Sequence, residues 1–80
     1  MRTIAQQWTS FEAAVLPASA GRVQRLETRR AFYAGFQAAL LAAVEMADES
    51  GDDDDLGVSM IQRLHEECQQ FAQAVATGRA

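Results

Sequence analysis

Four arginines lie within nine residues of the chain, in a stretch that is otherwise mostly apolar: Arg22, Arg25, Arg29 and Arg30. If this stretch is a helix, the first three project toward its apolar side and Arg30 projects away from it. Arg29 falls inside the apolar stripe itself, beside Tyr33. A guanidinium at such a position needs a carboxylate, an aromatic face or a bound anion as a partner.

A phosphorylated ligand is one partner that suits this pattern. The planar fork of arginine matches phosphate oxygens, and aromatic faces can stack on a nucleobase. In this interpretation Arg25 and Arg29 hold the phosphate, and the aromatic residues stack on the ligand or line its pocket. The candidate ligand-binding residues are Arg25, Arg29, Tyr33, Trp8 and Arg22.

A purely structural role is the alternative for the same arginines. Arg29 would then pair with Glu12 or with a carboxylate of a neighbouring subunit, or lie against the face of Trp8. Arg22 and Arg25 would be solvated charges in the first turns of the helix.

The residues that catalysis or metal binding would need are sparse. The chain has one histidine, His65, and one cysteine, Cys68, which argues against a metal site. Both lie at or beside an apolar register, which predicts packing roles: a partly buried His65 and a small core residue at Cys68. The consecutive aspartates 52–55 do not form a spaced acid–base pair. An EF-hand starting at Asp52 would place Leu56 and Arg63 at ligand positions. We therefore expect no enzyme, no catalytic residue, no metal and no cofactor.

Length and charge limit the class of protein. A chain of 80 residues forms one small domain that is marginally stable alone, which predicts a homo-oligomer. The net charge of −4 argues against a general DNA- or RNA-binding protein. The most apolar run, residues 31–47, is shorter than the roughly 20 residues of a membrane span, and the N-terminus lacks a signal-peptide core. We expect a cytoplasmic protein without a membrane partner.

Apolar periodicity predicts an all-α fold with three helices in a single domain, residues 1–80. The N-terminal helix carries Ile4, Trp8, Phe11 and Val15 on one narrow stripe and ends before Pro17. The long helix has a wide apolar arc, bordered by Phe32, and a second face of small residues around Gly35. The C-terminal helix has a seam with coiled-coil-like spacing. The predicted elements are a helix over about 3–16, a helix over about 20–49, an acidic turn over 50–56 and a helix over about 57–77.

The short acidic turn predicts how these helices pack. Helices joined by a short loop usually pack antiparallel, so the second and third helices are expected to form a hairpin with the first helix folded across its start. The face around Gly35 would accept a helix from a second copy.

Several short motifs resemble small helical proteins of tailed phages and prophages. They are V-L-P (15–17), Q-R-L-E-T-R-R-A-F-Y-A-G (24–35), the acidic turn, and L-H-E-E-C (64–68). The layout is also similar to phage hairpin sponge proteins that sequester cyclic-nucleotide immune signals, the anti-CBASS and anti-Thoeris proteins. This resemblance implies a homo-oligomer with ligands held between subunits. Since the chain has no lysine, Arg22, Arg25 and Arg29 would hold the phosphate.

Two functions follow as hypotheses. The first is a non-enzymatic phage protein that sequesters a small phosphorylated ligand, such as a nucleotide immune signal, in the host cytoplasm. The second is a phage inhibitor or adaptor that binds a host protein through helical surfaces. A structural phage component is a third possibility.

Overall fold

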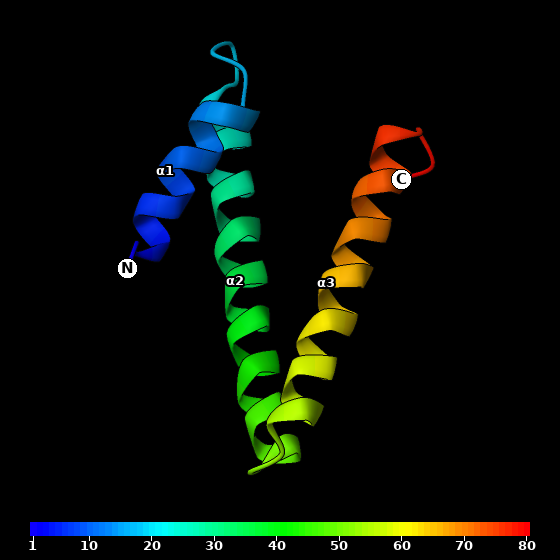
Figure 1. Cartoon of the computed structure of the whole chain (residues 1–80). Coiled ribbons are helices and arrows are strands. Elements are labelled where there is room, and N and C mark those ends of the chain that lie inside the picture. The colour runs from blue at the N-terminus through cyan, green and yellow to red at the C-terminus, as the bar shows by residue number, and fades with distance from the viewer. The chain divides into compact units, whose positions relative to one another are not determined.

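The chain is all-α, as its periodicity predicts. A computed structural model describes residues 1–80 and contains three helices and no strand: α1 (Ile4–Val15), α2 (Arg22–Ser50) and α3 (Asp54–Ala76) (Figure 1). The chain divides into two compact units, Met1–Ala42 and Ala43–Ala80, and α2 contributes to both. The two units are described separately below.

Helix α1 has defined signals at both ends. Thr3 is the N-cap: its side-chain oxygen accepts a hydrogen bond from the backbone N–H of Gln6 at 3.1 Å, and its own N–H donates to the Gln6 side chain at 2.9 Å. This reciprocal capping box satisfies two N–H groups that would otherwise lack partners. At the other end, Leu16 is extended, with ψ 132°, as expected for a residue that precedes proline.

An aromatic cluster joins α1 to the first half of α2. Trp8 is 7% exposed and is the one buried residue of the structure. Its ring centroid lies 5.5 Å from that of Phe32, which is 5.1 Å from Phe11 and 6.3 Å from Phe36. Tilted ring pairs at these distances are favourable geometries. The cluster therefore fixes α1 against α2 within the 1–42 unit.

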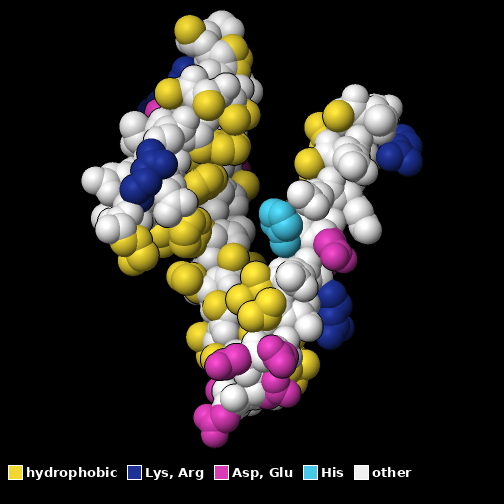
Figure 2. All heavy atoms as spheres, in the orientation of Figure 1, with side chains coloured by type: hydrophobic (Ala, Val, Ile, Leu, Met, Phe, Trp, Pro, Cys, Tyr) yellow, Lys and Arg dark blue, Asp and Glu magenta, His cyan; other side chains and the backbone are white.

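The turn between α2 and α3 is tighter than the sequence predicts. Gly51 adopts a positive φ of 52°, which glycine tolerates without steric cost. Asp53 then caps α3, its carboxylate accepting from the N–H of Leu56 at 3.0 Å. Helix α3 consequently begins at Asp54 instead of near Gly57, and two further aspartates occupy its first turn. Acidic side chains gather around this turn (Figure 2), where they interact favourably with the positive end of the α3 dipole.

Replacing Asp53 by alanine is expected to destabilise the start of α3 by about 1 kcal/mol, because the N–H of Leu56 loses its acceptor. Amide hydrogen exchange in the first turn of α3 measures the effect. Asp52→Ala is the matched control, since Asp52 precedes the cap and accepts no hydrogen bond. Equal protection in both variants would contradict the assignment of Asp53 as the cap.

Helix α3 has no buried residue. Its apolar seam is exposed throughout, from Ile61 at 58% through Leu64 at 41% to Phe71 at 65%. His65 and Cys68 are exposed as well, which differs from the packing roles predicted for them. No helix of the chain is both long enough and apolar enough to cross a bilayer.

Candidate functional site

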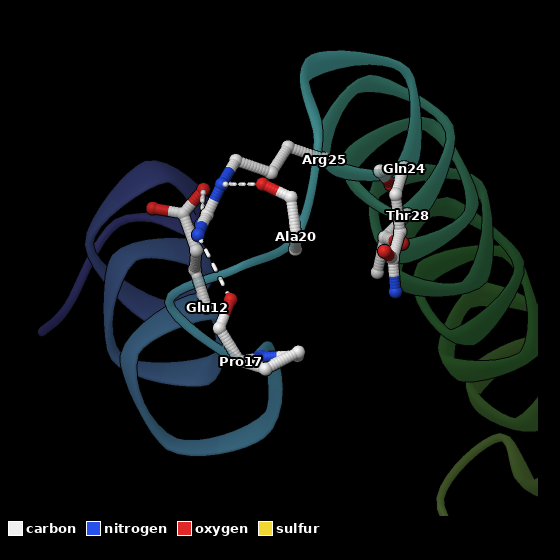
Figure 3. Close-up of polar contacts among 6 residues, drawn as sticks. All are labelled: Glu12, Pro17, Ala20, Gln24, Arg25 and Thr28. Carbon is white, nitrogen blue, oxygen red and sulfur yellow. Dashed lines mark hydrogen bonds and ion pairs between the residues drawn. The ribbon is translucent and has the colours of Figure 1, made fainter.

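Arg25 is the best-anchored arginine of the 1–42 unit. It projects from the first turn of α2 over the connector that follows α1 (Figure 3). Its Nε donates to the carbonyl of Ala20 at 3.2 Å, and its Nη2 donates to the carbonyl of Pro17 at 3.0 Å. Its Nη1 lies 3.4 Å from Oε2 of Glu12 on α1. One guanidinium thus ties together α1, the connector and α2.

Glu12, which the sequence suggested as an ion-pair partner for Arg29, therefore pairs with Arg25. Glu12 pairs with Arg25, and each side chain is 34% exposed. Arg29, one turn further along α2, instead has its guanidinium carbon 5.5 Å from the ring centroid of Tyr33. The predicted Arg29–Glu12 pair is wrong because the connector turns back at Pro17 and brings Glu12 level with the start of α2. Arg29 also makes no cation–π contact with Trp8; its aromatic partner lies on its own helix.

A depression of about 410 Å³ lies where α1 faces the start of α2. It brings together four of the five predicted ligand-binding residues: Trp8, Arg22, Arg25 and Arg29. Its remaining lining residues are Glu12, Ala20 and Leu26.

The fifth predicted residue, Tyr33, lies outside this depression. Tyr33 lines an adjoining depression of about 280 Å³ together with Leu26, Arg29 and Arg30. Arg29 and Leu26 line both depressions, so the two form neighbouring parts of one surface. Tyr33 also lines a third depression of about 480 Å³ with Ile4, Ala34, Gln37 and Leu40.

The charged residues that line the main depression differ in the ion pairs and hydrogen bonds that they form. Arg22 and Arg29 are exposed, and neither takes part in an ion pair or a hydrogen bond. Three arginines face one glutamate there, which leaves a local formal charge of +2. Arg30 points elsewhere, forming an exposed ion pair with Glu27 at 3.4 Å. The depression can therefore attract an anion with guanidinium groups whose N–H donors form no hydrogen bond or ion pair within the protein.

Trp8 also carries a polar group, its indole N–H. Its indole N–H donates no hydrogen bond within the protein, yet no buried polar side-chain atom lacks a partner. The N–H of this largely buried ring must therefore reach solvent.

Two groups that contribute to the site are backbone carbonyls, which cannot be identified from the residue types in the sequence. The carbonyl groups of Pro17 and Ala20 hold the Arg25 guanidinium, and a backbone carbonyl is carried by every residue. Pro17 marks the connector, but only the path of the connector shows that its carbonyls face α2. No group of three His, Cys, Asp or Glu side chains converges on a point that could hold a metal ion.

Replacing Tyr33 by phenylalanine is expected to change the free energy of unfolding by less than about 0.5 kcal/mol, because the hydroxyl makes no hydrogen bond within the chain. Urea unfolding followed by circular dichroism measures this. A loss above about 1 kcal/mol would mean that a neighbouring copy satisfies the hydroxyl.

Comparison with known proteins gives no family assignment: no family model matches the chain, and no curated protein or solved structure is significantly similar to it.

Proposed function

We propose that this protein binds a small phosphorylated ligand on the surface where α1 meets the start of α2, without catalysing a reaction. One observation carries the proposal: Trp8, Arg22, Arg25 and Arg29 line a single depression, and the guanidinium groups of Arg22 and Arg29 form no ion pair or hydrogen bond within the protein. Unpaired guanidinium groups beside an indole ring suit a phosphate attached to an aromatic group.

The distribution of charge favours a small ligand over a nucleic-acid polymer. The whole chain has a net charge of −4, and six of its eleven acidic residues, at positions 48, 49 and 52–55, lie around the turn between α2 and α3. A polymer gains its affinity from many phosphate contacts along an extended basic surface. Here four of the seven arginines lie within nine residues at one end of α2, and the other three are isolated along the chain.

We further propose that the ligand is a nucleotide immune signal, and that the protein is a phage product that sequesters it in the host cytoplasm. The resemblance of the motifs E-T-R-R-A-F (27–32) and L-H-E-E-C (64–68) to phage sponge proteins supports this identity. The sequestering protein would be a homo-oligomer in which α2 and α3 form an antiparallel hairpin. The exposure of the α3 seam supports a further packing partner, and so does Gly35, where an added Cβ would meet nothing within 4 Å.

Isothermal titration against cyclic dinucleotides, cyclic trinucleotides and ADP-ribose derivatives tests the proposal. At low ionic strength, at least one of these compounds is expected to bind at micromolar concentration or below. Native mass spectrometry of freshly purified protein would report a co-purified ligand and the number of subunits together. Absence of binding across the whole panel would refute nucleotide sequestration.

A second function is favoured by the exposed seam of α3. Ile61, Leu64, Phe71 and Val75 follow helical spacing and are all more than 40% exposed. An apolar stripe of this kind can lie in the groove of a host protein, as an inhibitor or adaptor would. Affinity purification from host lysate separates the two functions: a stoichiometric host protein lost on Phe71→Asp supports the inhibitor, while a phosphorylated small molecule supports the sponge.

A further inference from the structure

The guanidinium of Arg25 is largely committed to the protein itself. Each of its three nitrogens has a partner: the carbonyls of Ala20 and Pro17 and the carboxylate of Glu12 (Figure 3). These contacts join Arg25 on α2 to two preceding segments of the chain, α1 and the connector. Arg25 therefore fixes the wall of the depression, whereas Arg22 and Arg29 retain all their N–H donors.

Glu12 is the one acidic residue of the depression. Its Oε2 lies 3.4 Å from Nη1 of Arg25, and no group of the protein donates a hydrogen bond to either carboxylate oxygen. A carboxylate oxygen beside a ligand repels negative charge and accepts hydrogen bonds from N–H or O–H groups. Arg25 holds the Glu12 carboxylate in place and compensates part of its charge.

The local charge limits how much negative charge the ligand can carry. Three arginines and one glutamate leave +2, which balances one phosphomonoester dianion or two phosphodiester groups. A ligand with more phosphate would bring negative charge toward Glu12. A ligand with hydroxyl or amino groups beside its phosphate would instead donate hydrogen bonds to the Glu12 carboxylate, which accepts none within the protein.

We infer that the site selects phosphate esters whose uncharged part carries hydrogen-bond donors, and that the Glu12 carboxylate accepts hydrogen bonds from those donors. Arg22 and Arg29 contact the phosphate. Arg25 is a positioning residue that orients Glu12 and contacts no phosphate. This inference rests on the proposed binding of a phosphorylated ligand at the same depression.

The test compares two phosphate esters by isothermal titration. The probes are 5′-AMP, whose ribose and adenine carry donors, and phenyl phosphate, which has an aromatic face and no donor beyond its phosphate. The wild-type protein is expected to bind 5′-AMP at least about tenfold more tightly, the effect of one hydrogen bond to a charged group. The quantity compared between variants is the ratio of the affinity for 5′-AMP to the affinity for phenyl phosphate. Because 5′-AMP also has the larger aromatic surface, the change in this ratio on mutation is decisive.

Glu12→Gln removes the negative charge while keeping the size of the side chain. It is expected to weaken 5′-AMP binding and to strengthen phenyl phosphate binding, so that the ratio falls to within about threefold of one. An unchanged ratio would overturn the role of Glu12. Failure of the wild-type protein to bind either phosphate ester would instead overturn the proposed function itself, so the two failures are distinguishable.

Arg25→Lys tests the positioning role, since lysine keeps the charge and loses the fork. The ratio is expected to fall as it does in Glu12→Gln, with a smaller loss of phenyl phosphate binding than Arg29→Ala causes. A loss as large as that of Arg29→Ala would show that Arg25 itself contacts phosphate. Circular dichroism confirms that the variant is folded, and Glu12→Gln keeps the inference testable if it is not.

Discussion

Replacement of Trp8 by alanine is expected to unfold the Met1–Ala42 unit. Trp8 is its one buried residue and contacts both Phe11 and Phe32, so truncation removes the centre of the aromatic cluster. Loss of a buried tryptophan side chain costs about 3–5 kcal/mol. A small scaffold without disulfides rarely has more than about 3–5 kcal/mol of total stability, so the variant should lose α1 and the packing of α2.

Urea unfolding followed by circular dichroism at 222 nm measures this loss. Val23→Ala is the matched control, because Val23 lies in the same unit, is 72% exposed, and is replaced by a residue with higher helix propensity. Its free energy of unfolding should stay within about 0.5 kcal/mol of the wild-type value. A Trp8→Ala variant as stable as Val23→Ala would show that the cluster does not hold the unit together.

Replacement of Arg29 by alanine is expected to abolish ligand binding and leave the fold intact. Arg29 lines both neighbouring depressions, and its guanidinium forms no ion pair. Its one internal interaction is with the ring of Tyr33, worth about 0.5–1 kcal/mol at an exposed site. Affinity for a bound nucleotide should fall at least tenfold, because a charge-assisted contact to phosphate disappears.

Isothermal titration and thermal unfolding together measure the Arg29→Ala effect. Arg63→Ala is the control, as it removes an equal charge from α3, outside the 1–42 unit. Equal affinities of the two variants would mean that only net charge matters. A loss of stability above about 3 kcal/mol would instead assign Arg29 to a structural ion pair with a neighbouring copy.

The helices and their class could be predicted because periodicity and end signals agree. The Trp8–Phe11 stripe and Pro17 define α1 without reference to the rest of the chain. Phe32 shows where this approach stops: the helical wheel placed it at the border of the apolar arc, yet it is central to the aromatic cluster. The wheel gives the direction of a side chain but not which neighbouring helix lies on that side.

The start of α3 and the partner of Glu12 show two further limits. Four consecutive aspartates offer several equivalent caps, and only the tight turn at Gly51 selects Asp53. Similarly, Glu12 could reach Arg25 or Arg29 by residue count, and the path of the connector decides for Arg25. The sequence predicted which arginines share a face of the helix. It could not predict that Arg25 is held by the connector and Glu12 while Arg22 and Arg29 form no ion pair, because that depends on the path of the backbone.

Trp8 is also the single tryptophan of the chain, and it lies in only one of the two compact units. Its fluorescence therefore reports on residues 1–42 alone, whereas circular dichroism reports on all three helices. If the two signals are recorded on one sample, coincident transitions mean that the chain unfolds as one cooperative system. Separate transitions would give each unit its own melting temperature without any label or truncation.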